Sequence, residues 1–416
     1  MRVLHLIDPA SPGGGPCTLK LLGEAMSRAA GRRDEIHDVV IIGNSGHLAM
    51  ARRCGVRTSL RIGATLNRPV LGRRTLRAML EQRAHSGAGY DLLHAWTLNS
   101  AVAAALVAEG RPVLGMAPIG FTGRLADLKL LGRHRVPILA ATATVESELI
   151  SAGYQRDLVT VLAPTVDPNA IVTEARGPLR ESWDADETTF VVALLSELYD
   201  DSDGVHAMHA AARIALTGKD IRIVLHHRPA RWSLRWQLPK VGLPGLIVVD
   251  DRVIEPWRVV AGLDAAFSLH HPRDRVARRP RGLPLSWAAP AMHILPGRRG
   301  PSRARLTPLL WAMAAGVPAI AEADRAGDWI EDGDTGLLTT VGDHNRTAAR
   351  LLDLHDNPAL ARRVGTAGRK QIETRFDGDT FMSRLAVAWH QCLHGERIEL
   401  REISEQQSAS ELVAET

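Results

Sequence analysis

The chain alternates short apolar runs with longer segments in which apolar residues recur at helical spacing. Runs such as Val3–Ile7 and Asp38–Ile42 open this pattern, and a second series begins at Thr188–Leu195. Short apolar runs are typical of parallel strands buried on both faces, and the periodic segments are typical of amphipathic helices. Two successive series of alternating strands and helices predict an α/β protein with parallel sheets.

The length of the chain predicts more than one domain. At 416 residues it exceeds what one hydrophobic core normally holds, so we expect two domains. The pair Gly177-Pro178 separates the two series and is typical of a linker. We therefore expect a first domain over residues 1–176 and a second over 177–395. The chain becomes polar after Gly395, which predicts a disordered tail over 396–416.

Composition is that of a water-soluble globular protein, with 45% hydrophobic and 23% charged residues. The formal charge of +5 suits an anionic small molecule, an anionic membrane surface or nucleic acid, although an arginine-rich proteome explains it equally well. The three cysteines are too scattered for a disulfide framework or a zinc site. Without an apolar leader or a run of about 18 apolar residues, we expect a cytoplasmic protein.

The stretch Leu309–Asp343 reads as helix, turn, strand, short helix, turn and strand. Gly316 ends the first helix because glycine tolerates a positive φ, and Pro318 prevents its continuation. Asp328 is expected to begin a further turn, whose positive end favours an acidic side chain. A strand–helix–strand unit of this kind is the usual layout of a nucleotide site.

A glycine-rich loop follows the first strand. Gly13, Gly14 and Gly15 leave backbone N–H groups that could meet a phosphate or a sugar. The alternative interpretation is a flexible turn between a strand and a helix.

Residues 312–343, AMAAGVPAIAEADRAGDWIEDGDTGLLTTVGD, resemble the donor-binding core of the family-4 retaining glycosyltransferases. The order of elements also matches through the helices Asn345–Leu354 and Leu360–Phe376. The resemblance implies the GT-B fold, in which two Rossmann-like domains face each other across a cleft. It also implies that the C-terminal helix Asp379–Leu393 crosses back to the first domain. A nucleotide-sugar would be the donor substrate, and no metal or other cofactor would be required.

The residues that match the donor contacts of this family are substituted. Trp311 stands where the family has the glutamate that grips the donor ribose, and Arg303 stands where it has the glutamate that holds the sugar. Glu197 and Asp203 replace the arginine and lysine that clamp the diphosphate. By resemblance, the residues expected to meet the donor are Gly13, Gly14, Gly15, Arg303, Arg305, Leu306, Thr307 and Trp311.

Two positions fall on the sugar or acceptor side of the cleft in the same resemblance. Pro118 replaces a histidine of the family motif, whereas His94 matches one at the end of a strand. A lone histidine at a strand end is more often a hydrogen-bonded structural residue. The acceptor could be a glycan, a lipid-linked molecule or a small molecule.

The segment His270–Arg305 is an arginine-rich insertion. It leaves open whether Ala265–Leu269 or Ala291–Leu295 is the strand that precedes the donor loop. We expect no nucleic-acid partner, because aromatic residues that could stack on bases do not interleave the arginines. The segment Phe121–Arg135 reads either as a basic helix lying on an anionic membrane at the inner face or as a core-facing helix with solvated arginines.

Two hypotheses for function follow. The first is an active glycosyltransferase in which the arginine insertion holds the donor diphosphate, since arginine suits phosphate oxygens. The second is a catalytically inactive relative that acts as a binding or regulatory protein. We also expect Trp311 to be buried, which would narrow the ribose pocket.

Overall fold

The structure is a computed structural model that describes residues 1–11, 13–30, 35–57, 60–62, 69–118, 125–195, 201–226, 245–250, 252, 255–269 and 307–400. It contains a seven-stranded sheet of order β3-β2-β1-β4-β5-β6-β7 and a six-stranded sheet of order β10-β9-β8-β11-β12-β13. All strand pairs among the described residues of both sheets are parallel. The α/β prediction with two parallel sheets is therefore confirmed.

The N-terminal half carries the seven-stranded sheet. Its strands are β1 (Arg2–Ile7), β2 (Ile36–Ile42), β3 (Leu60–Ile62), β4 (Leu92–Ala95), β5 (Val113–Ala117), β6 (Ile138–Ala140) and β7 (Val159–Val161). Its helices are α1 (Pro16–Ala29), α2 (Ser45–Arg53), α3 (Pro69–His85), α4 (Leu98–Ala105), α5 (Leu125–Arg133) and α6 (Ala143–Ser151).

The C-terminal half carries the six-stranded sheet. Its strands are β8 (Phe190–Leu194), β9 (Ile221–His226), β10 (Ile247–Asp250), β11 (Ala265–Phe267), β12 (Ala319–Glu322) and β13 (Leu337–Thr339). Its helices are α7 (Arg176–Ser182), α8 (Asp201–Ala215), α10 (Pro256–Val259), α11 (Thr307–Ala314), α12 (Ala323–Ala326), α13 (His344–Asp356) and α14 (Pro358–Arg375).

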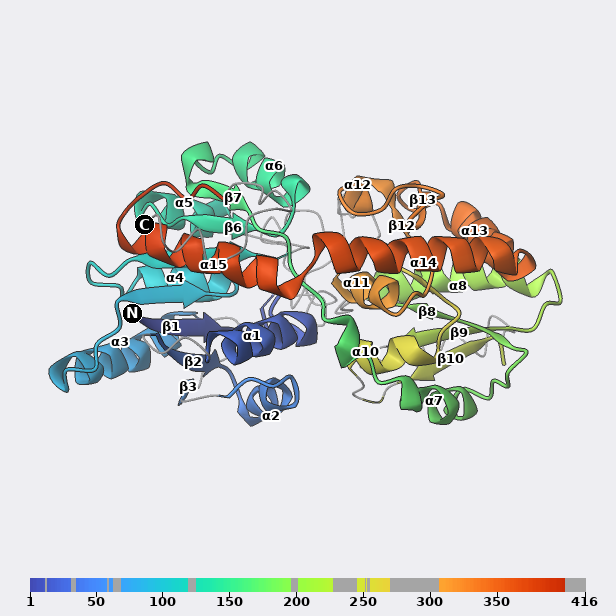
Figure 1. Ribbon diagram of the computed structural model, residues 1–416, viewed down its shortest axis with the longest axis horizontal. Coiled ribbons are helices and arrows are strands. Elements are labelled where there is room, and N and C mark those ends of the chain that lie inside the picture. Colours follow the sequence, from blue (N-terminus) through green and yellow to red (C-terminus); the bar gives the residue numbers. More distant parts are fainter. Residues whose placement is uncertain are drawn as a thin grey trace, which may run out of the picture.

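Figure 1 shows the two halves side by side along the long axis of the molecule, with α14 on the second half. The last helix, α15 (Gly378–Leu393), returns to the first half and lies against α1 and β5. Arg28 of α1 forms an ion pair with Asp379 at the start of α15. The predicted crossing of the C-terminal helix is confirmed.

Short-range sequence signals explain where many helices begin. The side chains of Thr97 and Thr142 accept hydrogen bonds from the backbone N–H groups of the first turns of α4 and α6. Asn357 and Asp377 do the same for α14 and α15. These residue types are favoured at helix N-termini because their oxygens satisfy N–H groups that have no partner within the helix.

The structure differs from the expected organisation at two places. Gly177-Pro178 lies inside the first turns of α7, which proline tolerates because the first helical N–H groups have no intrahelical partner. Residues 396–400, assigned from their polarity to a tail, pack against the N-terminal half. Ile398 is buried, and its carbonyl oxygen accepts a hydrogen bond from Thr160. Residues 401–416 lie outside the described residues.

The strand β11 pairs with β8 on one side and β12 on the other, so Ala265–Phe267 is an integral part of the second sheet. The alternative strand Ala291–Leu295 lies outside the described residues. All three residues of β11 are buried, as expected for a central strand covered on both faces.

Candidate functional site

The glycine loop after β1 is closely packed, and two of its glycines have no space for a side chain. Gly13 has a φ of +78°, and a Cβ atom there would lie 2.0 Å from Cγ of Pro118. A Cβ atom on Gly14 would lie 2.0 Å from the carbonyl oxygen of Asp8. The structure therefore brings Gly13 together with Pro118, which follows β5.

Asp8, which directly follows β1, accepts hydrogen bonds from this loop and from α4. One carboxylate oxygen accepts a hydrogen bond from the backbone N–H of Ala10 at 3.0 Å, and the other accepts one from the Asn99 side chain at 3.5 Å. Burial raises the pKa of the Asp8 carboxyl. Sequence reasoning missed Asp8 and Asn99, although an acidic residue directly after the first strand is a signal that could have pointed to it.

Trp311 is buried, as predicted, with 2% of its surface exposed. Its ring packs against that of Trp257 on α10, with centroids 5.2 Å apart. The ammonium of Lys20, on α1 of the other half, lies 5.6 Å from the centroid of the Trp257 ring. An aromatic contact within the C-terminal half thus occupies the position at which the resembled family has a ribose-binding glutamate. Lys20 reaches this contact from the N-terminal half.

The other expected donor contacts lie at or beyond the edge of what the structure describes. Thr307 is the first residue of α11. Arg303, Arg305, Leu306 and Glu197 lie outside the described residues, so the prediction that arginines replace the diphosphate clamp stays a prediction.

His94 lies inside the core of the N-terminal half, and none of its surface is exposed. Its Nδ1 accepts a hydrogen bond from the indole N–H of Trp389 on α15, at 3.2 Å. Its Nε2 has no hydrogen-bond partner among the described residues. Burial lowers the pKa of His94 to about 3, so the ring is neutral near pH 7. The structure does not bring His94 together with Pro118 in one site.

The two halves touch directly where the first sheet ends. The backbone N–H of Thr144, in the first turn of α6, donates a hydrogen bond to a carboxylate oxygen of Asp328 at 2.9 Å. Asp328 therefore interacts with the N-terminus of a helix in the other half. A carboxylate is stabilised there by the positive end of the helix dipole. Arg53 and Glu255 form a further ion pair between the halves at 3.0 Å.

A pocket of about 530 Å³ opens beside this contact. Its lining includes Asp328 and one face of α6, with the side chains of Thr144, Ser147, Glu148 and Ser151. Ser147 and Glu148 follow Thr144 by three and four residues and precede Ser151 by four and three, so the four lie on the same side of the helix. The pocket therefore has a wall of hydroxyl and carboxylate groups between the halves. Sequence reasoning missed it, because its two sides lie far apart along the chain.

Within the described part of the chain, no group of three or more His, Cys, Asp or Glu residues is placed to hold a metal ion. Among the same residues, no helix combines the length and the apolar character needed to span a membrane.

No protein-family model matches the chain. Among curated proteins, 63 residues are 41% identical to EpsD of Bacillus subtilis, which carries the name of a glycosyltransferase. A further match of 92 residues is 32% identical to the N-acetyl-α-D-glucosaminyl L-malate synthase of Bacillus anthracis. These matches cover 15% and 21% of this chain, and 16% and 24% of the two relatives.

Solved structures match over nearly the whole chain. HepE from Anabaena, in a complex with UDP and glucose, has a TM-score of 0.69 at 19% identity, covering 93% of this chain and 98% of HepE. A UDP-N-acetylglucosamine 2-epimerase has a TM-score of 0.62 at 11% identity, covering 97% of this chain and 99% of the epimerase. At these identities the likeness concerns the fold. The chain has the GT-B fold, two Rossmann-like halves with a C-terminal helix that crosses back, and glycosyltransferases are among its structural neighbours.

Proposed function

We propose that this protein is a glycosyltransferase that moves a sugar from a nucleotide-sugar donor to an acceptor. The observation that carries the proposal is the likeness to HepE over 93% of the chain, because the HepE structure contains UDP and glucose. Short matches to EpsD and to a glucosaminyl-transferring synthase support it. The pattern in residues 312–343 further supports a family-4 enzyme that retains the anomeric configuration.

The donor would lie between the glycine loop and the carboxyl ends of the strands in the second sheet. Ligands of open α/β sheets bind at this edge. Helix α1 begins at Pro16, directly after Gly15, so its positively polarised N-terminus would face the donor phosphates. Stabilising the departing diphosphate is the main electrostatic task of such a site. Arg303 and Arg305 would perform it in place of the family clamp.

A second candidate function is favoured by one observation, the buried contact between Trp311 and Trp257. Trp311 cannot accept hydrogen bonds from ribose hydroxyls, because an indole offers only a donor. A protein without this grip could bind sugars or partners without turnover. A UDP-N-acetylglucosamine 2-epimerase has a similar fold, and fold alone does not specify chemistry.

The acceptor would bind on the side of the N-terminal half. Contact with an anionic membrane surface is a further part of the proposal. It rests on α5, where Leu128 and Leu131 are buried while Lys129 and Arg133 are exposed and Leu125 is 57% exposed. A protein that stays in the cytoplasm and meets the membrane only at its surface would fit this arrangement.

Thermal unfolding in the presence of UDP, GDP, ADP and their sugar conjugates tests the proposal. A ligand at about 100 times its Kd adds about 2.7 kcal/mol to the free energy of unfolding. Release of free nucleoside diphosphate from the stabilising donor, measured with a mixture of glycan and lipid acceptors, then tests turnover. Stabilisation without release would favour the inactive alternative. No stabilisation by any nucleotide would refute the glycosyltransferase.

A further inference from the structure

A pocket of about 510 Å³ lies at the amino ends of three neighbouring strands in the second sheet. Phe190 begins β8, Asp264 directly precedes β11 and Pro318 directly precedes β12, and each of them lines the pocket. Ligands of open α/β sheets bind at the carboxyl ends of strands. This pocket is therefore at the opposite edge from the proposed donor site, and its occupant would be a different molecule.

The floor of the pocket is apolar. Phe190, Leu263, Val317 and Leu354 contribute to it, and the last three are at least nine-tenths buried. The ring of Phe190 meets the edge of the His355 ring, with centroids 5.4 Å apart. The volume lies within the range of about 300–1,000 Å³ that is typical of small-molecule sites. An apolar body of moderate size would cover the surface that these side chains still expose, most of it from Phe190.

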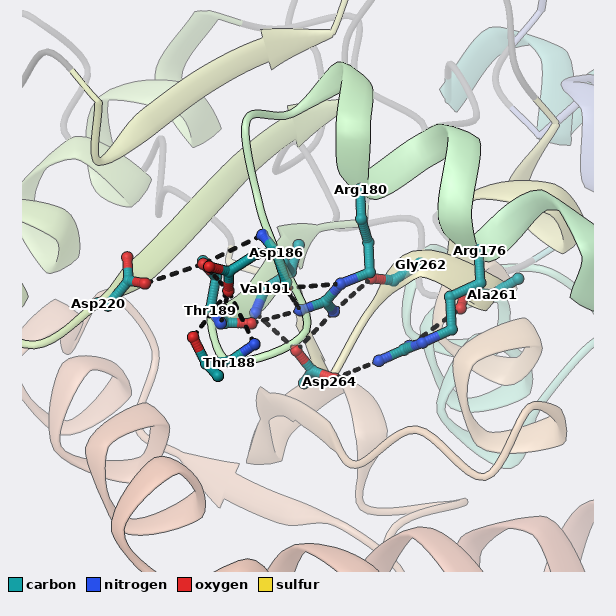
Figure 2. A network of polar contacts seen from close by, with 10 residues as sticks. All are labelled: Arg176, Arg180, Asp186, Thr188, Thr189, Val191, Asp220, Ala261, Gly262 and Asp264. Atoms are coloured by element: carbon teal, nitrogen blue, oxygen red, sulfur yellow. Dashed lines mark hydrogen bonds and ion pairs between the residues drawn. The ribbon is translucent and has the colours of Figure 1, made fainter.

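Arg180 fixes one wall of the pocket through hydrogen bonds (Figure 2), and it is only 2% exposed. Its guanidinium donates to a carboxylate oxygen of Asp264 at 3.0 Å and to the carbonyl oxygen of Gly262 at 3.3 Å. It also donates to the carbonyl oxygens of Asp186, at 2.6 Å, and Thr189, at 2.5 Å. A buried charge with this many hydrogen bonds fixes the groups around it.

The turn that carries Thr188 and Thr189 is fixed in the same way. A carboxylate oxygen of Asp186 accepts hydrogen bonds from both backbone N–H groups, at 2.8 Å and 3.0 Å. Thr188 and Thr189 line the pocket. The wall therefore has its final geometry before a ligand arrives, which reduces the entropy lost on binding.

The charges around the pocket indicate the kind of ligand. Asp264 is occupied by Arg180 and by Arg176, whose guanidinium donates to its other oxygen at 3.3 Å. Arg362 on α14 lines the mouth and is exposed, and the structure shows no ion pair for it among the described residues. Glu187 also lines the pocket and is exposed. One available cation beside one acid favours a ligand with a single negative charge over a polyanion.

We propose that this pocket binds a small amphipathic monoanion. Its apolar body would cover the floor formed by Phe190, Val317 and Leu354. Its anionic group would interact with the guanidinium of Arg362, which suits carboxylate and sulfonate oxygens.

Two fluorescent probes of nearly the same shape test this site in the full chain. The anion 8-anilinonaphthalene-1-sulfonate and the uncharged N-phenyl-1-naphthylamine share the apolar body and differ in charge. Ala361, which lines the pocket and is partly buried, is replaced by tryptophan to fill the space. Arg362→Glu reverses the charge at the mouth. Lys370→Glu, on the same helix and exposed, is the matched control because Lys370 does not line the pocket.

We expect Ala361→Trp to abolish the saturable binding of both probes. Arg362→Glu should raise the Kd of the anionic probe by at least about fivefold, equal to about 1 kcal/mol, and leave the Kd of the neutral probe unchanged. Lys370→Glu should change neither. Unaltered thermal unfolding and circular dichroism would show that Ala361→Trp still folds. Equal probe binding by wild type and a folded Ala361→Trp protein would overturn the site. Equal weakening by Arg362→Glu and Lys370→Glu would overturn the assigned charge.

Discussion

The indole N–H of Trp389 donates a hydrogen bond to Nδ1 of His94 across 3.2 Å, joining two side chains that are 295 residues apart in the chain. Neither side chain has exposed surface. Trp389 lies on α15, and His94 lies on β4 near the centre of the first sheet. This bond fastens the returning C-terminal helix to the core of the N-terminal half.

A second indole makes the same kind of bond nearby. Trp96 donates to Nδ1 of His5 at 3.1 Å, and Nε2 of His5 lies 3.0 Å from Nδ1 of His37. Nε2 of His37 lies 3.0 Å from a carboxylate oxygen of Glu35. Because an indole can only donate, Nδ1 of His5 must accept, so the proton of His5 is on Nε2. The arrangement therefore requires His5 and His94 to be neutral.

The first prediction concerns the pH dependence of stability. Burial lowers the pKa of His5 well below its usual value and that of His94 to about 3, whereas in the unfolded chain a histidine has a pKa of about 6.5. Below that pH the unfolded state binds protons that the folded state excludes. The contribution of these histidines to the free energy of unfolding is therefore fully present above about pH 6.5 and is lost as the pH falls toward about 3. The loss is up to about 1.4 kcal/mol per pH unit for each histidine.

Urea unfolding between about pH 7 and about pH 4 measures this loss. His94→Gln removes one of the two titrations, so the free energy of unfolding should fall less steeply in this variant. His390→Gln, an exposed histidine on α15, is the control and should keep the wild-type slope. Identical slopes for wild type and His94→Gln would show that His94 does not exclude a proton in the folded state.

The second prediction concerns the fastening of α15. Trp389→Phe removes the N–H donor and leaves the buried Nδ1 of His94 facing only Nδ1 of His5 at 3.2 Å, which itself already accepts from Trp96. We expect a loss of about 1–3 kcal/mol, the desolvation cost of an unsatisfied buried group. Chemical denaturation at neutral pH measures it, with Trp389→Ala as a second variant that should cost about 3–5 kcal/mol through the added cavity. If Trp389→Phe unfolds like the wild type, the hydrogen bond does not stabilise the fold.

The third prediction concerns the glycine loop. Gly13→Ala should destabilise the protein, because Gly13 has a φ of +78° and faces the ring of Pro118. The left-handed backbone alone costs about 1–2 kcal/mol. The double variant Gly13→Ala, Pro118→Ala should recover the part due to the clash with the ring atom Cγ, at 2.0 Å, while the Cβ contact at 2.9 Å remains. Gly177→Ala is the control, since a Cβ atom there meets nothing within 4 Å. A double variant no more stable than Gly13→Ala alone would rule out the contact with Pro118.

The fourth prediction concerns the donor diphosphate and rests on the proposed function. Arg305→Ala should weaken nucleotide binding by about 1.5–3 kcal/mol, the range for hydrogen bonds to charged groups. Glu197→Ala should leave binding unchanged or improve it, because a carboxylate repels phosphate. Calorimetric titration at one fixed salt concentration measures both. If Arg305→Ala leaves nucleotide affinity unchanged and Glu197→Ala lowers it, the diphosphate does not bind beside Arg305.

Local patterns were enough to predict most of the elements. The apolar run Val3–Ile7 predicted β1, and all but its first residue is buried. The burial of Trp311 also followed from its place on an apolar helix. The family resemblance, which depends on the order of several elements, predicted the two sheets and the return of α15. The individual strands and helices follow from residues close together in the chain, where hydrophobic spacing and turn residues act directly on the backbone.

The contacts that shape the site were decided by the tertiary structure. The resemblance placed His94 on the acceptor side, and the alternative was a hydrogen-bonded structural histidine. Strand β4 lies between β1 and β5 beneath α15, which places the His94 side chain in the core. Gly13 meets Pro118, and Thr144 meets Asp328, only because strand order and the packing of the halves bring distant residues together. The pattern of a single strand predicts which of its residues are buried. It does not predict which neighbouring residues they face. That choice depends on how whole sheets and halves pack, a property of the complete chain.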